Sequence, residues 1–278
     1  MNYINDLINI AIKEDIGDGD HTSLSCIPTN AKGKAHLIVK EAGIIAGVEL
    51  AQTIFQKIDA QLLFQKKISD GEQVNVGDIV FTVEGSSQSI LKAERLALNF
   101  MQRMSGIATN TKHYVNLLDG LSTQVLDTRK TTPGLRHIEK WAVKIGGGAN
   151  HRMGLYDMIM IKDNHIDYAG GIKEAIRSTT AYIKKNKKPL QIEIEARDLN
   201  ELDEILAAGG IHRIMLDNFS FEDMQTAVTL IDGKYETEAS GGITSETIRR
   251  YAECGVDFIS VGALTHQIKS LDLSLKAF

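Results

Sequence analysis

The sequence predicts an α/β barrel of fewer than eight strands, preceded by a smaller α+β domain. From about residue 110, apolar strand-like runs alternate with helical patterns, and the last intervals, of about 22 residues, leave room only for a strand, a turn and a helix. Such repetition predicts parallel strands. The first hundred residues carry short β-like runs between Gly and Asp turns instead. We therefore expect domains at 1–108 and 109–278, and the last residues are candidates for packing back on the first domain.

The N-terminal domain is expected to be a small sheet with helices. An amphipathic helical pattern fills residues 1–20, and a second covers 49–58. A third, at 89–106, places Leu91, Leu98, Met101 and Met104 at helical spacing and is expected to end at Gly106. The expected strands lie at 34–40, 44–50, 61–68 and 78–85.

The second domain is expected to contain six strands, with a helical pattern after each of the first five. The strands end near Thr128, Ile161, Ile194, Leu216, Ala239 and Val261, and helical patterns cover 135–144, 171–184, 198–207, 220–231 and 244–253. Neither GxGxxG nor GxxxxGK[ST] occurs, which disfavours the nucleotide-binding open sheets. The roughly 165 residues available are too few for an ordinary eight-stranded barrel.

Polar and glycine residues follow each expected strand. In a barrel these positions meet at the carboxyl-end rim, where barrel enzymes hold their catalytic groups. The rim residues are Arg129 and Lys130 after the first strand, then Lys162, Glu195, Asp217, the run Ser240, Gly241 and Gly242, and finally Gly262 with Ala263.

Charge and composition restrict the partners. The chain carries a net charge of −5, yet Asp127–His165 holds seven Lys and Arg against four Asp and Glu, a local +3. A basic island in an acidic protein favours a small anionic ligand over nucleic acid. Cys26 and Cys254 lack metal-site or disulfide spacing, the N-terminal pattern is interrupted by acids, and no apolar run reaches the roughly 18 residues of a membrane span. We expect a cytoplasmic soluble protein.

Each group of rim residues also has a plainer interpretation. The SGGITSETI turn suits phosphate, with Thr244 or Ser245 capping a following helix, but could be only a tight turn. Glu195 and Asp217 could be helix caps or ion-pair partners; together on one rim they suit Mg²⁺ or ribose hydroxyls. The cations could be solvated, or could bind a dicarboxylate. Glu193 shares a strand face with Glu195, so it is expected to line the barrel in an ion pair.

The motifs resemble quinolinate phosphoribosyltransferase over nearly the whole chain. They are EDIGDGDHTS, AERLALNF, DTRKT, PGLR, GGGANHRMGL, IKDNH, LDN, EASGGI and SVGALTH. Trp141 and Ile145 stand where the family pattern would have Tyr and Cys, and both lie between motifs.

The resemblance implies an activity and roles for single residues. It implies that phosphoribosyl pyrophosphate (PRPP) and quinolinate give nicotinate mononucleotide, pyrophosphate and carbon dioxide, with Mg²⁺, in NAD biosynthesis. It also implies a homodimer with a shared active site, and whether dimers assemble further stays open. The implied quinolinate pocket comprises Arg95, Arg129, His151, Arg152 and Lys162. The implied PRPP site comprises Thr128, Lys130, Glu195, Asp217, Ser240, Gly241, Gly242, Gly262 and Ala263, with Mg²⁺ at Glu195 and Asp217, directly or through water. Lys130, Lys162, Glu195 and Asp217 are the expected catalytic residues.

Two other functions stay open at this point. A related phosphoribosyltransferase could take another acidic heterocycle, although the complete set of cations argues against that. A barrel could also bind a phosphosugar as a non-catalytic sensor, which retention of both Glu195 and Asp217 disfavours. The residue that protonates the carbon after decarboxylation is not identified by the sequence, and Lys162 is a candidate.

Overall fold

The structure, a computed structural model, describes residues 3–278 and forms two compact units. The first comprises the residues up to 112 together with 131–147 and 264–278, and the second comprises 113–130 and 148–263. These units divide the chain differently from a single cut after residue 108. Two segments that follow the cut belong to the first unit, because helix α5 (Arg136–Ile145) contacts α1 (Tyr3–Ile16) and strand β12 (Leu273–Ala277) pairs with β1 (Lys32–Val39).

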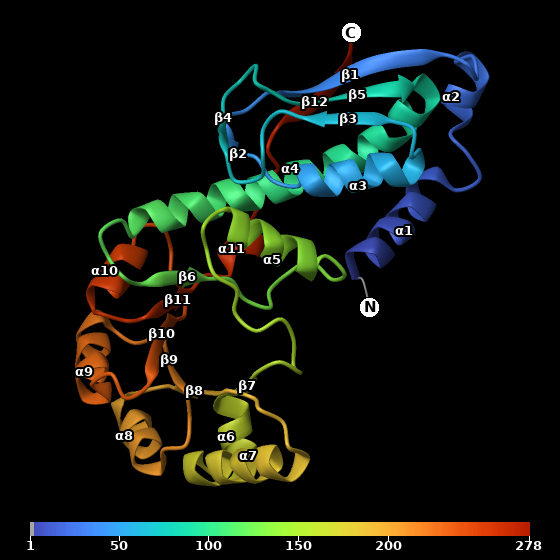
Figure 1. Ribbon diagram of the computed structural model, residues 1–278. Coiled ribbons are helices and arrows are strands. Elements are labelled where there is room, and N and C mark those ends of the chain that lie inside the picture. Colours follow the sequence, from blue (N-terminus) through green and yellow to red (C-terminus); the bar gives the residue numbers. More distant parts are fainter. Residues whose placement is uncertain (1–2) are drawn as a thin grey trace. The chain divides into compact units, whose positions relative to one another are not determined.

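The first unit is built on an antiparallel sheet of order β12-β1-β5-β3, with β5 at Ile79–Ser86 and β3 at Leu63–Lys66 (Figure 1). Alternate residues of β1 are buried, as expected for a sheet with one covered face. Helix α3 (Val48–Ile58) buries Phe55, whose ring lies among those of Phe64 and Phe81. Helix α2 (His21–Cys26) and the short pair β2 (Gly43–Ile44) and β4 (Gln73–Val74) complete the elements of this part.

Two expectations for the N-terminal elements were wrong. The run 44–50 is not a strand: β2 ends at Ile44, and Gly47, with φ 92°, turns the chain into α3. The helix expected to end at Gly106 continues, since α4 spans Ser87–Leu117. Gly106 is required by packing rather than by a helix end, because a Cβ there would lie 2.3 Å from the Lys269 carbonyl oxygen. Met1 and Asn2 of the expected first helix lie outside the described residues.

The second unit contains the six-stranded parallel sheet. Its strands are β6 (Gln124–Leu126), β7 (Ile159–Ile161), β8 (Ile192–Ala196), β9 (Arg213–Asp217), β10 (Glu236–Ser240) and β11 (Phe258–Ser260). Their order is β6-β11-β10-β9-β8-β7, so β6, the first strand of this sheet along the chain, lies beside β11, its last. That is the winding of a barrel, open between β6 and β7, with a single bridge from Leu126 to Ala149 at the β6 edge. The expected α/β barrel with fewer than eight strands is confirmed.

Helices follow the strands much as the sequence indicates. They are α6 (Asp163–Ala169), α7 (Ile172–Asn186), α8 (Leu199–Ala208), α9 (Phe221–Ile231), α10 (Ile248–Glu253) and α11 (Ala263–His266). In Figure 1, α8, α9 and α10 lie along the same side of the neighbouring strands. Helix α6 was not expected. The helix expected at 244–253 begins only at Ile248, so neither Thr244 nor Ser245 caps it. No described helix is both long and apolar enough to cross a membrane.

The register of the strands determines which polar side chains share a face. Glu193 of β8 and Glu236 of β10 are both paired with Arg213 of β9, so the three form one layer. The next layer contains Glu195, Met215 and Glu238. Because side chains alternate along each strand, both layers lie on one face, and Asp217 follows on that face at the carboxyl end. Acidic residues thus line one face of the sheet from its middle to its rim.

Candidate active site

A lysine and a glutamate meet at the carboxyl ends of β7 and β8. The Lys162 Nζ lies 2.6 Å from the Glu195 Oε2, and the Glu195 side chain is only 7% exposed. Lys162 directly follows the apolar strand Ile159–Ile161, which fixes its backbone at the rim. Of the two plain interpretations of Glu195, ion pairing is therefore confirmed and helix capping is wrong, since the α8 cap is Asp198. The pair places opposite charges side by side at the rim.

Asp217 and the glycine turn after β10 form the neighbouring part of the rim. The Asn218 amide nitrogen Nδ2 donates to the Asp217 Oδ2 at 2.6 Å, and the Asn218 backbone N–H donates to the Ser240 carbonyl oxygen at 2.9 Å. A Cβ at Gly241, where φ is 97°, would lie 2.2 Å from the Asn218 Oδ1, so only glycine fits. Asp217 does not cap α9 either, because Ser220 does. The half-buried carboxylate of Asp217 is held at the rim.

The segment after β6 supplies the next rim residues. The Thr128 hydroxyl accepts the Lys130 backbone N–H at 3.0 Å, a local turn that begins the DTRKT segment. Thr128 is half-buried, whereas Arg129 and Lys130 are exposed. Directly before Thr128, Asp127 is fully buried and its Oδ1 accepts the His151 backbone N–H at 2.9 Å. One carboxylate therefore connects the end of β6 to the GGGANHRMGL segment.

The imidazole of His151 lies against two buried carboxylates. Its Nε2 is 2.9 Å from the Glu193 Oε2 and 3.3 Å from the Glu238 Oε2, and both glutamate side chains are 0% exposed. The imidazole Nε2 is thus at ion-pair distance from both carboxylates. Arg213 adds a second cation, with its Nη1 3.3 Å from the Glu238 Oε2. The expected ion pair of Glu193 inside the barrel is confirmed.

The carboxylates dominate the protonation of this cluster. Burial alone would lower the pKa of His151, but the hydrogen bonding and charges of Glu193 and Glu238 outweigh it and raise the pKa to about 9. Burial and the nearby Glu238 raise the pKa of Glu193. The His151 Nδ1 lies 2.6 Å from the Arg152 backbone nitrogen, a contact that only an unprotonated Nδ1 accepts. In that tautomer the ring proton lies on Nε2, facing the carboxylates, and the raised pKa of Glu193 allows a further proton to lie on that carboxylate rather than on Nδ1.

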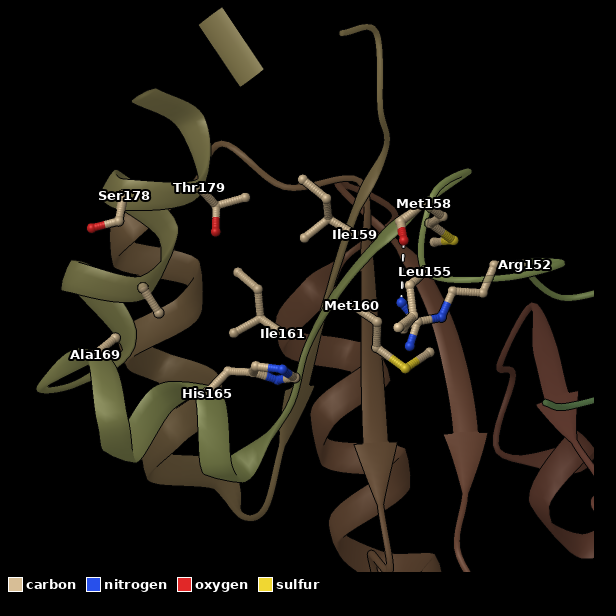
Figure 2. A pocket seen from close by; sticks show the side chains of 11 residues that line it. Arg152, Leu155, Met158, Ile159, Met160, Ile161, His165, Ala169, Ser178 and Thr179 are labelled. Carbon is tan, nitrogen blue, oxygen red and sulfur yellow. Dashed lines mark hydrogen bonds between the residues drawn. The ribbon is translucent and has the colours of Figure 1, made fainter. Parts of the chain in front are cut away.

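Arg152 is held differently, between the rim and an apolar pocket. Its Nη1 donates to the Met158 carbonyl oxygen at 3.2 Å, while its buried Nε has no hydrogen-bond partner among residues 3–278. Burial, together with the charge of Arg129, lowers the pKa of Arg152. The pocket, of about 340 Å³, is otherwise lined by Leu155, Met158, Ile159, Met160, Ile161, His165, Ala169, Ala175, Ser178 and Thr179 (Figure 2). A mostly apolar lining does not suit phosphate, so this pocket is distinct from the expected PRPP site.

Most of the residues predicted from the sequence lie in the second unit, on or next to the strand ends. Arg95 is the exception: it is exposed on α4 and belongs to the first unit. The residues in the second unit are Thr128, Arg129, Lys130, His151, Arg152, Lys162, Glu195, Asp217, Ser240, Gly241, Gly242, Gly262 and Ala263.

The sequence interpretation missed Glu238, Arg213 and the contact of Asp127. Glu238 could have been found, because ETEAS (236–240) repeats the alternation of IEIE, and period two predicts that Glu238 faces the same side as Ser240. Arg213 opens the strand RIMLD as a lone cation, a residue type that is usually solvated. Nothing local in the sequence indicates that Asp127 accepts from His151, because the partners are 24 positions apart.

Comparison with known proteins identifies two consecutive family domains along the chain. Residues 20–105 match the family model "Quinolinate phosphoribosyl transferase, N-terminal domain", and residues 107–276 match the C-terminal domain of the same family. Quinolinate phosphoribosyltransferase [decarboxylating] 1 of Nicotiana glauca is 47% identical over 97% of this chain and 81% of its own length. The probable nicotinate-nucleotide pyrophosphorylase [carboxylating] of Bacillus subtilis is 42% identical over 97% of this chain and 91% of its own.

Solved structures give the same result for the fold. The crystal structure of NadC from Streptococcus pyogenes superposes with a TM-score of 0.93 at 42% identity, covering 98% of this chain and 95% of that one. The nicotinate-nucleotide pyrophosphorylase of Francisella tularensis superposes with a TM-score of 0.92 at 40% identity, covering 100% and 96%. Matches of this extent include every strand of the barrel and the N-terminal sheet. The chain belongs to the quinolinate phosphoribosyltransferase family.

Proposed function

We propose that this protein transfers the phosphoribosyl group of PRPP to quinolinate and releases pyrophosphate and carbon dioxide, giving nicotinate mononucleotide for NAD biosynthesis. Membership of the family over nearly the whole chain is the observation that carries this proposal. The rim supports it, because Lys162, Glu195 and Asp217 place charges of both signs at adjacent strand ends. A reaction between two anionic substrates through a cationic sugar needs both.

On this proposal the cations bind the two substrates. Arg129, Arg152, His151 and Lys162, with Arg95, hold the carboxylates of quinolinate, and a guanidinium offers a carboxylate two parallel donors. Lys130 and the backbone of the turn Ser240–Gly242 hold the phosphates of PRPP. Glycine at 241 and 242 keeps that turn free of side chains, so its N–H groups are open to a phosphate.

The chemistry follows from the charges. Loss of pyrophosphate leaves an oxocarbenium-like ribose, which the carboxylates of Asp217 and Glu195 stabilise while Lys130 neutralises the leaving group. The pyridine nitrogen then attacks the anomeric carbon. Once quaternary, that nitrogen stabilises the carbanion left by departing carbon dioxide. We assign the following protonation to Lys162, whose ammonium group is the cation nearest the Glu195 carboxylate.

Mg²⁺ fits the donors at this rim. Glu195 and Asp217 lie on adjacent strands and on the same face, and carboxylate oxygens are the ligands that Mg²⁺ takes together with substrate phosphates. Bound there, the ion would neutralise charge on the pyrophosphate. Because Lys162 already contacts Glu195, the ion and the ammonium group would share that carboxylate.

The assembly and the location are also proposals. We infer a homodimer in which Arg95 of one subunit reaches the barrel of the other, since Arg95 is exposed and belongs to a different unit from the remaining site residues. A cytoplasmic location is supported by the two free cysteines, Cys26 and Cys254.

One titration tests the activity. Pyrophosphate release should require both quinolinate and PRPP with Mg²⁺, and neither substrate alone should give turnover. Release with a different acidic heterocycle, but not with quinolinate, would identify a related phosphoribosyltransferase. Binding of PRPP without any release would identify a sensor.

A further inference from the structure

We infer that Glu238, acting together with Glu193, is a positioning residue for quinolinate binding: through the His151 imidazole it fixes the dipeptide His151–Arg152 at the rim. This inference rests on the proposed placement of His151 and Arg152 in the quinolinate pocket. Neither glutamate is among the residues to which the family resemblance gives a role; Glu238 shares the layer of Glu195, and Glu193 lies one layer further from the carboxyl ends of the strands.

The first support is the burial of the carboxylates. Glu193 and Glu238 are fully buried, and their oxygens lie 2.9 and 3.3 Å from the same His151 Nε2. Taking two carboxylates out of water costs several kcal/mol each unless cations compensate them. A chain that needed only a filled barrel would use apolar residues at these positions, as it does at Met215 in the same layer as Glu238. The arrangement therefore serves the imidazole.

The second support is the number of contacts that hold the dipeptide. The His151 backbone N–H is bound by the buried Asp127, its Nε2 faces the two glutamates, and its Nδ1 accepts the Arg152 backbone N–H at 2.6 Å. The ring is thus fixed at both nitrogens. Rotation of the imidazole would break the Nδ1 contact and release the Arg152 backbone. The carboxylates therefore restrain Arg152 as well as His151.

The third support is the charge balance of the cluster. Arg213 contacts Glu238 at 3.3 Å, and its other nitrogens contact Glu236 at 3.0 and 2.8 Å. The two buried carboxylates face Arg213 and the proton on the imidazole Nε2, so neutralising one carboxylate leaves that proton with a weaker acceptor. The three side chains His151, Glu193 and Glu238 also have the spacing of a metal site. Arg213 supplies the positive charge that a metal ion would otherwise provide.

The decisive experiment measures the quinolinate KM, the PRPP KM and kcat for Glu238→Gln. We expect the quinolinate KM to rise by about tenfold or more, because a mispositioned two-point carboxylate contact loses at least that factor. The PRPP KM and kcat at saturating quinolinate should stay within about threefold. Glu238 is the better site for the test, since Glu193 is only two residues from Glu195.

Glu236→Gln is the matched control. Glu236 lies on the same strand and also pairs with Arg213, so this variant removes an equal charge from the same arginine; the Glu236 side chain, however, is half-exposed. The variant should leave the quinolinate KM unchanged. Glu238→Asp keeps the charge at a shorter reach and should give an intermediate KM, and it also serves if Glu238→Gln does not fold.

A double-mutant cycle separates positioning from a structural role. In a His151→Gln background, Glu238→Gln should raise the quinolinate KM no further, because the effect passes through the imidazole. Equal effects in both backgrounds, or a loss of thermal stability with an unchanged quinolinate KM, would overturn the inference. A normal KM for His151→Gln itself would instead remove His151 from the proposed pocket. Stabilisation of the wild type by Zn²⁺ or Mn²⁺, absent in Glu238→Gln, would show a metal site and also overturn it.

Discussion

Arg152 is the residue whose loss should most clearly separate the two substrates. Arg152→Ala removes a partly buried guanidinium, and truncating one partner of such a charge pair costs about 2 to 5 kcal/mol. Quinolinate binding should be lost while PRPP affinity changes little, as measured by calorimetry with each substrate. Arg177→Ala, an exposed arginine on α7, is the control and should change neither affinity. The reverse order of losses would move Arg152 to the phosphate side.

Asp217 should matter for turnover rather than for folding. Asp217→Asn keeps the shape at the end of β9 but removes one negative charge near the developing cation, so kcat should fall by about 10²-fold. The exposed change Asp203→Asn on α8 should leave kcat unchanged. If Asp217→Asn kept normal turnover and normal Mg²⁺ dependence, the Asp217 carboxylate would have no part in catalysis.

The rim positions of single residues could be predicted where a residue follows an apolar strand-like run. Lys162 follows the run MIMI, and Asp217 follows the run RIML. Their partners are less predictable. The contact of Lys162 with Glu195 joins residues on two strands, and the pairing of Arg213 with Glu238 depends on the register between β9 and β10. Register is set by the assembled sheet, so such contacts are absent from any single segment of sequence.

At the scale of elements, Asp70 is the residue on which the start of α3 depends. Its Oδ1 accepts the Val48 backbone N–H at 2.8 Å. Asp70→Ala loses this bond and should lower the free energy of unfolding by about 1 kcal/mol. Asp70→Asn keeps an acceptor at the same place and should retain most of the stability. Chemical denaturation at neutral pH compares the two variants, and equal losses would show that charge, not the hydrogen bond, is what matters.

The same residue should give a pH dependence of known sign. Burial raises the pKa of Asp70 above 3.8, despite hydrogen bonds that lower it. The folded protein then holds this proton more tightly than the unfolded chain, so the contribution of Asp70 to stability falls as pH rises from 3.8 to the raised pKa. Asp70→Asn should remove this decrease of the free energy of unfolding with rising pH. Asp20, the N-cap of α2, should behave in the opposite way, because hydrogen bonds from Ser23 lower its pKa. Its contribution to the free energy of unfolding should rise with pH, and Asp20→Asn should remove that rise.

Strands and helices with clear periodicity were predicted well, and the errors have local causes. The run IIAGVEL reads as a strand because it is apolar, yet its glycine begins a helix instead. Gly106 reads as a helix end, yet it allows close approach of the Lys269 backbone. A sequence shows where a glycine is, but not whether that glycine turns the backbone or lets another segment pack closely against it. Close packing depends on a segment that is distant in the sequence.

For the whole molecule, mixing two inactive variants tests the shared active site. Arg95→Ala and Lys162→Ala should each be nearly inactive, but unfolded and reassembled together they should form heterodimers with one intact site. Random pairing makes about half of the dimers mixed, so roughly a quarter of wild-type activity should return. Heterodimers without activity, detected by differential tagging, would show that Arg95 acts within its own chain.

The pairing of β12 with β1 affects how the chain is made on the ribosome. Strand β1 (Lys32–Val39) emerges early in translation, but its partner Leu273–Ala277 emerges only after almost the whole chain. Until then one edge of β1 has no strand beside it, and such edges invite pairing with other chains. The barrel strands can all form before this edge is closed. Release of a stalled or shortened nascent chain would therefore leave an aggregation-prone N-terminal sheet next to a finished barrel.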